Sequence, residues 1–151
     1  MHGARVIWKA EGDVATGRYS RAHEWHFDGG AVVRASSSPA VVPLPFSDPG
    51  GVDPEEAFVA SLSSCHMLWF LDLARRAGFV PLAYEDRAEG RMEQQGGRLW
   101  ITQVTLRPRV TWAQAPGRAQ EAALHHAAHE QCFIANSVRT DIVIDLEGEM
   151  E

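Results

Sequence analysis

The sequence predicts an α+β fold. Several short stretches alternate apolar and polar residues, as strands with one buried face do. Two longer stretches, at about residues 53–78 and 117–135, have the composition of helices. The helices separate groups of strands rather than alternating with single strands, which favours α+β over a doubly wound fold. We expect residues 1–151 to form a single domain.

Composition narrows the classes of function. Hydrophobic residues make up 45% of the chain and charged residues 23%, as in ordinary globular proteins. The net charge of −6 argues against a nucleic-acid partner. No charge-free apolar run reaches the roughly 18–20 residues of a membrane span, and the first residues lack the apolar core of a secretory signal. We therefore expect a cytoplasmic protein with no membrane partner, whose two cysteines are kept reduced.

The N-terminal third reads as strands and a long loop. Residues 5–10 predict a strand, and residues 12–20 have turn chemistry. Residues 21–33 predict a β-hairpin around Asp28-Gly29-Gly30, since glycine allows the positive φ of a tight turn. Residues 35–52 hold four prolines and two glycines, so they predict a loop, and a loop of this length is often functional.

The first helix has clear start and stop signals. Asp53 is a good N-cap, and Pro54 suits the first helical position. Glu55 and Glu56 follow in the first turn, and Gly78 marks the end. Because the stretch is apolar on nearly every face, we expect a central, buried helix.

The second half reads as a hairpin, a helix and a strand. Residues 82–94 and 98–112 predict two strands joined at 95–97. The helix at 117–135 is rich in alanine, and residues 141–146 alternate as a last strand.

The two cysteines are the first candidates for chemistry. Either Cys65 or Cys132 alone is more often a small packing residue than a reactive one. Both lie in predicted helices of small residues, which can pack closely. Two facing cysteines can form a disulfide when their Cα atoms come within about 7 Å. Such a pair could form a sulfenic acid on one thiol and resolve it with the other.

Histidines offer a rival interpretation. His125 and His129 have the i, i+4 spacing of a zinc site on one helix face, with Cys132 nearby. The stretch lacks the H-E-x-x-H pattern, so a solvated helix face is favoured. His66 could tune the Cys65 thiolate or make a core contact. Neighbouring helical positions face different sides, so the core contact is favoured.

Glu55 and the early arginines complete the candidates. Glu55 precedes Cys65 by ten residues, about 15 Å along a straight helix, so the two side chains cannot meet within one straight helix. Glu55 is therefore either an end residue that suits the helix dipole, or it reaches a cysteine across a helix break or a dimer. Arg18 and Arg21 are the cations of the early turn region.

Two motifs carry a family resemblance. The stretch VDPEEAFVASLSSCHMLWFL resembles the N-P-E-[EQ]-L motif of the OsmC/Ohr family (osmotically inducible protein C and organic hydroperoxide resistance proteins), in which a cysteine follows the glutamate by ten positions. HEQCFIANSV, followed by DIVIDL, resembles the family's second cysteine region. The order of predicted elements is similar over nearly the whole chain.

The resemblance implies a fold, an activity and a site. It implies an OsmC-like, intertwined homodimer with two long central helices packed between antiparallel β-sheets, and active sites at the dimer interface. Cys65 would be the peroxidatic cysteine and Cys132 the resolving cysteine. Glu55 and Arg21 would hold the thiolate and orient the peroxide; Arg21 is preferred to Arg18 by its distance from the Asp28-Gly29 turn.

The implied function is a thiol-dependent peroxidase for organic hydroperoxides in oxidative-stress defence, with inorganic peroxides left open. Its reductant would be a dithiol, often lipoyl-linked, and no bound cofactor or metal is needed. The sequence departs from the family where Phe133 replaces a common proline, and where His66 and Trp69 add bulk beside Cys65.

A second function remains open, namely a non-catalytic protein that binds a hydrophobic small molecule in the dimer-interface pocket. The side chains suited to lining such a pocket are Val42, Leu44, Phe46, Phe58 and Trp69.

Overall fold

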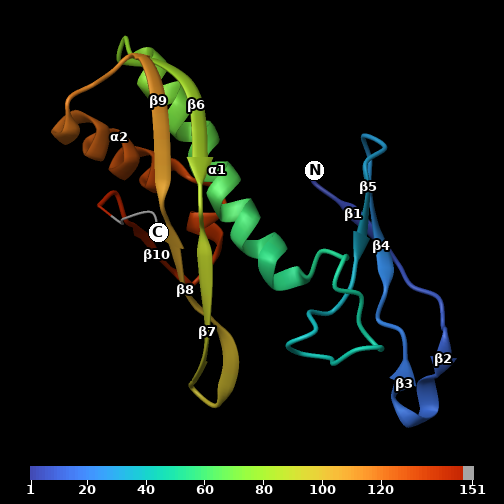
Figure 1. Cartoon of the computed structure of the whole chain (residues 1–151). Helices are drawn as coiled ribbons and strands as arrows, with labels where there is room; N and C mark the ends of the chain where they lie inside the picture. The colour runs from blue at the N-terminus through green and yellow to red at the C-terminus, as the bar shows by residue number, and fades with distance from the viewer. Residues whose placement is uncertain (148–151) are drawn as a thin grey trace. The chain divides into compact units, whose positions relative to one another are not determined.

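The computed structural model describes residues 1–147 and divides the chain into two compact units, Met1–Ala57 and Phe58–Glu151 (Figure 1). Each unit is described by itself. The strands and helices confirm the α+β class, while a single domain over 1–151 stays a prediction.

The N-terminal unit is built on a three-stranded antiparallel sheet. Its order is β1-β4-β5, with bounds Ala4–Ile7, His23–Phe27 and Val32–Ala35. The hairpin predicted at Asp28-Gly29-Gly30 is confirmed, and Gly30 has a φ of 95°. The first strand ends at Ile7, earlier than predicted. The stretch predicted as a turn holds a short ribbon of β2 (Gly12–Asp13) and β3 (Arg18–Tyr19) around the 3-10 turn η1 (Val14–Thr16).

The loop before the long helix is tied down by polar contacts. The backbone N–H of Asp48 donates to Ser36 Oγ at 2.9 Å, and Arg34 Nε donates to Asp48 Oδ2 at 3.0 Å. The hydrogen bond from Arg34 lowers the pKa of Asp48 below its usual range. The segment predicted as a loop is therefore a loop with a defined conformation.

Helix α1 (Pro54–Arg76) begins and ends as predicted. Asp53 Oδ1 accepts from the Glu56 N–H at 2.8 Å, and Glu56 Oε1 accepts from the Asp53 N–H at 2.9 Å. This reciprocal pair is a capping box that satisfies two backbone donors. At the other end Gly78 has a φ of 90°, and the Phe79 N–H bonds to the Ala74 carbonyl at 3.0 Å.

The burial of α1 differs from the prediction. Within one chain it buries a single stripe, spaced by four residues: Leu62, His66, Phe70 and Ala74. Leu68, on another face, is 61% exposed. The expectation of a helix buried all round is therefore wrong for the single chain. By length and composition α1 could also cross a membrane, a property that core helices of soluble proteins share.

The hairpin of the C-terminal unit has four strands where two were predicted. They are β6 (Val80–Asp86), β7 (Glu89–Gln95), β8 (Arg98–Leu106) and β9 (Pro108–Gln114). β7 pairs with β8 and β6 with β9, so the predicted hairpin is one long ribbon with a break. At the break an Asp86 carboxylate oxygen accepts from the Arg107 backbone N–H at 2.6 Å, and Pro108 has no N–H to give. At the break, the Asp86 side chain thus takes the place of a backbone hydrogen bond between the two strands.

The last elements are α2 (Arg118–Gln131), the 3-10 turn η2 (Ala135–Ser137) and β10 (Asp141–Ile144). β10 pairs parallel with β8, giving the order β10-β8-β7. The expectation of purely antiparallel sheets is therefore wrong. The reason is topological: β9 continues in the direction of β8, and α2 and the turn after it carry the chain back, so β10 runs in the direction of β8.

Helix α1 connects two core clusters. Leu62 packs with Val104 and Leu106 of β8, over the sheet that contains β10. Phe70 and Ala74 pack with Ala128 of α2. Tyr84, Val110 and Trp112 of the β6–β9 pair cover this second cluster. The stretch of α1 between the clusters, at residues 65 and 66, faces the end of α2.

Candidate functional site

The structure brings the two cysteines together. Cys65 lies in the middle of α1, and Cys132 directly follows the last residue of α2. The Cys65 thiol lies near enough to the Cys132 thiol to raise its pKa, and both cysteines are free. Cys65 is half-buried, whereas Cys132 is 1% exposed. The site therefore has one accessible thiol and one buried thiol in contact.

The position of Cys132 corrects the predicted helix end. The helix was expected to continue to residue 135, but it ends at Gln131 and Cys132 has the extended backbone of a C-cap. The N–H of Ala135 donates to Cys132 Sγ at 3.4 Å, and the N–H of Asn136 donates to the Cys132 carbonyl at 3.0 Å. The turn after α2 thus fixes the thiol. The spacing of small residues alone could not show this, because Phe133 and Ile134 continue the apolar pattern.

The surroundings of the Cys132 thiol determine its protonation. Burial raises the pKa of the Cys132 thiol, and the neighbouring Cys65 raises it further, while the Ala135 N–H partly opposes this. Cys132 is thus held as a neutral thiol at pH 7. Because the thiolate is the reactive form, Cys132 is poorly suited to make the first attack.

An aromatic pair lies beside the thiols. Trp69, one helical turn after Cys65, meets Phe133, the residue after Cys132, with ring centroids 5.4 Å apart and an edge-to-face angle of 75°. Phe133 is 69% exposed. Trp69 and Phe133, two residues at which the sequence departs from the OsmC/Ohr pattern, therefore contact each other beside the cysteine pair.

A buried pair of histidines connects the two helices. His66 Nε2 and His125 Nδ1 are 2.9 Å apart, and the ring planes differ by 5°. His125 also stacks on Phe70, with centroids 3.9 Å apart. Burial lowers the pKa of His66 to about 4 and that of His125 to about 3, so both rings are neutral at pH 7. The interpretation of His66 as a core contact is confirmed, and its partner was not foreseen.

The zinc alternative finds no support in the described residues. His125 is engaged with His66, and the exposed His126 pairs with Glu130 at 3.1 Å. Over residues 1–147 no group of three or more His, Cys, Asp or Glu side chains is arranged to hold a metal ion.

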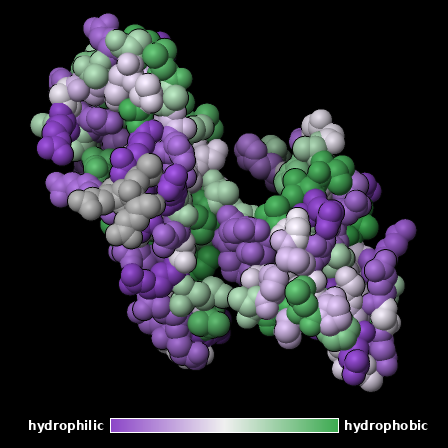
Figure 2. Space-filling model, viewed as in Figure 1, coloured by the Kyte–Doolittle hydropathy of each residue, from purple (hydrophilic) through white to green (hydrophobic). Residues whose placement is uncertain are grey.

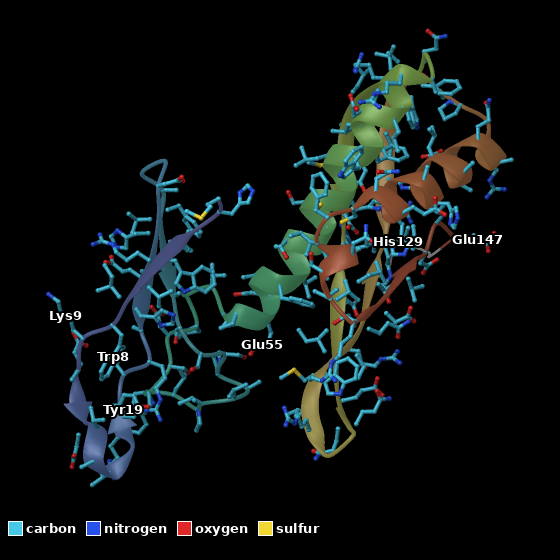
Figure 3. The ribbon with its side chains drawn as sticks, turned by 180° about the vertical axis from the view of Figure 1, so that it is seen from behind. Trp8, Lys9, Tyr19, Glu55, His129 and Glu147 are labelled. Carbon is cyan, nitrogen blue, oxygen red and sulfur yellow. The ribbon has the colours of Figure 1, made fainter. Side chains whose placement is uncertain are left out.

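Glu55 and Arg21 lie on different elements. Glu55 is in the first turn of α1 (Figure 3). Arg21 belongs to the N-terminal unit, where its guanidinium lies 3.5 Å from the centre of the Tyr19 ring and donates to the Gly17 carbonyl at 3.0 Å. Arg18 lies over the Phe46 ring at 5.8 Å. That Glu55 and Arg21 meet the Cys65 thiolate stays a prediction.

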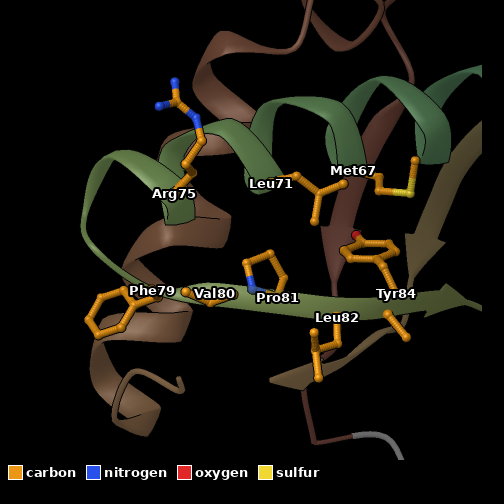
Figure 4. Close-up of a pocket in the computed structure, with 9 residues that line it drawn as sticks. Met67, Leu71, Arg75, Phe79, Val80, Pro81, Leu82 and Tyr84 are labelled. Carbon is orange, nitrogen blue, oxygen red and sulfur yellow. The ribbon is translucent and has the colours of Figure 1, made fainter. Parts of the chain in front are cut away.

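An apolar groove lies between α1 and β6, with a volume of about 530 Å³ (Figure 4). It is lined by Met67, Leu71, Arg75, Phe79, Val80, Pro81, Leu82, Ala83 and Tyr84. None of the five residues suggested for a hydrophobic pocket lines it. Phe58 instead lines a separate cavity of about 350 Å³, with Trp100 and Ile101 among its neighbours. In the sequence, the available signal for this groove was the pair of apolar residues Val80 and Leu82, which the structure leaves exposed.

The structure has an α+β fold in which the two helices bring two free thiols together. The two sequence motifs indicate the same class of protein. The family model described as OsmC-like protein matches residues 47–147. The chain belongs to the OsmC-like family. A comparison with curated protein sequences finds no match.

Solved structures are similar over nearly the whole chain. An OsmC-like protein of unknown function from Vibrio cholerae is 47% identical, with a TM-score of 0.92, covering 96% of this chain and 97% of its own. OhrB of Bacillus subtilis, an organic hydroperoxide resistance protein, is 20% identical, with a TM-score of 0.63 and coverage of 95% and 96%. An organic hydroperoxide resistance protein from Legionella pneumophila is 17% identical, with a TM-score of 0.68 and coverage of 96% and 95%. The last two likenesses show the fold alone.

Proposed function

We propose that this protein is a thiol-dependent peroxidase that reduces organic hydroperoxides in the cytoplasm, as part of oxidative-stress defence. The observation that carries the proposal is the contact between Cys65, which is accessible, and Cys132, which is buried. The structurally similar proteins from Bacillus subtilis and Legionella pneumophila, both named for organic hydroperoxide resistance, support it at the level of the family.

The chemistry runs in two steps. The Cys65 thiolate attacks one oxygen of the O–O bond, the alkoxide leaves and takes up a proton as the alcohol, and Cys65 becomes a sulfenic acid. Cys132 then attacks the Cys65 sulfur, and the sulfenic oxygen leaves as water while the disulfide forms. A dithiol, for which a lipoyl-linked group is suited, reduces the disulfide by exchange. No bound cofactor takes part.

Glu55 and Arg21 are proposed to complete the site. A guanidinium stabilises both a thiolate and a departing oxyanion, and a carboxylate holds the guanidinium in place. Glu55 lies about 15 Å from Cys65 along α1, so we propose that the pair acts on a cysteine across a dimer.

The exposed faces of α1 support a homodimer. Ser64 and Leu68 are exposed, and Met67 and Leu71 are only partly buried. Figure 2 shows apolar side chains at the surface of the C-terminal unit. A helix of this composition is ordinarily covered on more than one face. We therefore propose that a second copy of the chain packs on α1.

Leu68→Glu is expected to convert the dimer to monomer, because it would place a charge in the proposed interface. Leu99→Glu is the matched control, since Leu99 is equally exposed, at 61%, but lies near the hairpin between β7 and β8. Sedimentation velocity at several concentrations measures the result. A Leu68→Glu protein that remains dimeric would contradict this interface.

Peroxide consumption measured by stopped flow, with a dithiol reductant in excess, tests the proposed function. We expect rapid turnover of an aromatic hydroperoxide such as cumene hydroperoxide.

The groove at Met67, Leu71 and Tyr84 favours a second candidate function, namely a protein that binds an apolar small molecule. Saturable binding of an apolar ligand without any peroxide turnover would favour that candidate instead.

A further inference from the structure

The face of α2 that packs against α1 carries a stripe of residues. His125, Ala128 and Cys132 are each 1% exposed or less, and their spacing places them on one side of the helix. His129 occupies the remaining position of this stripe, one turn after His125 and three residues before Cys132. Figure 3 labels His129 on α2.

His129 has an unused nitrogen inside the protein. Its Nδ1 is buried and has no hydrogen-bond partner among residues 1–147, although the ring as a whole is partly exposed. His129 also interacts electrostatically with His66, which places its ring on the α1 side of the helix. A neutral imidazole can accept a proton on one nitrogen and release one from the other. A ring that is part buried and part exposed can thus carry a proton between the interior and water.

Cys132 needs a neighbouring group that can accept its proton. Its thiol must lose a proton before the sulfur can attack, and burial separates it from water. The titratable group that shifts the pKa of the Cys132 thiol is Cys65 from α1. Three histidines are coupled to one another in the same part of the fold, namely His66 from α1, and His125 and His129 from α2. From β6, Tyr84 reaches this region through its contact with Phe70. Among residues 1–147, no carboxylate is one of the groups that shift the pKa of the Cys132 thiol.

The histidine pair is a poor acceptor. His66 Nε2 and His125 Nδ1 lie 2.9 Å apart, and the second nitrogen of each ring is buried without a partner. Both side chains are 1% exposed, and burial disfavours a charge on either ring. His129 is therefore the histidine of the cluster best placed to take up a charge.

We propose that His129 accepts the proton of Cys132 as Cys132 attacks oxidised Cys65. The Cys132 sulfur forms a bond to the Cys65 sulfur, the group on Cys65 leaves with the electron pair of the broken bond, and the thiol proton moves to the free nitrogen of His129. Water later removes this proton from the ring. The inference deepens the proposed function and rests on its disulfide-forming step.

Ellman's reagent, an aromatic disulfide, isolates this step without peroxide. The accessible Cys65 thiolate displaces one thionitrobenzoate anion and keeps the other as a mixed disulfide. Attack by Cys132 then releases the second anion, which is coloured and leaves without needing a proton. The rate of the second release, from pH 6 to 9, therefore reports the deprotonation of Cys132.

His129→Gln is the test variant and His126→Gln the matched control, since His126 is the neighbouring histidine but points into solvent. We expect the second release in His129→Gln to be at least about a hundredfold slower at pH 7, the lower end of the effect of a lost general base. The deficit should shrink as pH rises and the thiolate forms unaided. His126→Gln should match the wild type.

A His129→Gln rate equal to the wild-type rate would overturn the inference, as would a deficit that is the same at every pH. Circular dichroism checks that the variant is folded, and His129→Asn repeats the test if it is not. If the second release depends on His129 but no hydroperoxide is consumed, the proposed peroxidase fails while this inference stands.

Discussion

Cys65→Ser is expected to abolish peroxide reduction, with a fall of at least about a thousandfold in kcat/KM for cumene hydroperoxide. The serine hydroxyl cannot replace the thiolate that cleaves an O–O bond, and the remaining thiol, Cys132, is buried and protonated. Stopped-flow consumption of the hydroperoxide, with a dithiol reductant in excess, measures the loss.

Cys132→Ser is the informative companion to this variant. It should complete one turnover, since Cys65 can still attack, and should then stall as a sulfenic acid that further peroxide converts to sulfinic acid. Mass spectrometry of the intact chain follows the added oxygens.

For the first variant, steady turnover by Cys65→Ser at the wild-type rate would refute the assignment of Cys65 as the nucleophile.

Acid is expected to destabilise the fold through the His66–His125 pair. Both histidines have a folded-state pKa well below the unfolded value near 6.5, at about 4 and about 3. Their contribution is therefore fully present above pH 6.5, and it is lost as the pH falls toward 4, because the unfolded chain binds more protons. We expect the free energy of unfolding to fall by several kcal/mol between pH 7 and pH 4. Urea titrations at several pH values measure it.

A double variant isolates the effect of the pair. His66→Leu with His125→Leu removes both titrating groups and leaves no unpaired nitrogen, so the loss of stability between pH 7 and pH 4 should be much smaller. His125→Leu alone leaves His66 Nε2 buried without its partner, and should cost about 1–3 kcal/mol at pH 7. A double variant with the same pH dependence as the wild type would show that other groups cause the acid sensitivity.

The sequence was most informative where local chemistry decides structure. The boundaries of α1 followed from Asp53, Pro54 and Gly78, since caps and φ preferences act over a few residues. The first hairpin followed in the same way from Asp28-Gly29-Gly30. The two cysteines could be paired as candidates because both lie in stretches that can pack closely.

Long-range features were beyond the sequence. The break at Asp86 and Arg107 arises because a carboxylate happens to meet a backbone N–H 21 residues away, and no periodicity encodes this. The parallel pairing of β10 with β8 depends on the path of α2. His66 and His125 are 59 residues apart and meet only because α1 crosses α2. Because histidine is polar, the sequence favoured a solvated helix face at His125. The structure buries His125, because its ring pairs with that of His66.

The central claim is that Cys65 and Cys132 act as one redox pair. The most direct test oxidises the reduced protein with one equivalent of cumene hydroperoxide, blocks the remaining thiols, and maps the peptides by mass spectrometry without reduction. The account predicts a Cys65–Cys132 crosslink within each chain, with no free thiol left to block. Two blocked thiols after the hydroperoxide has been consumed, or a stable oxidised Cys65 beside a free Cys132, would contradict it.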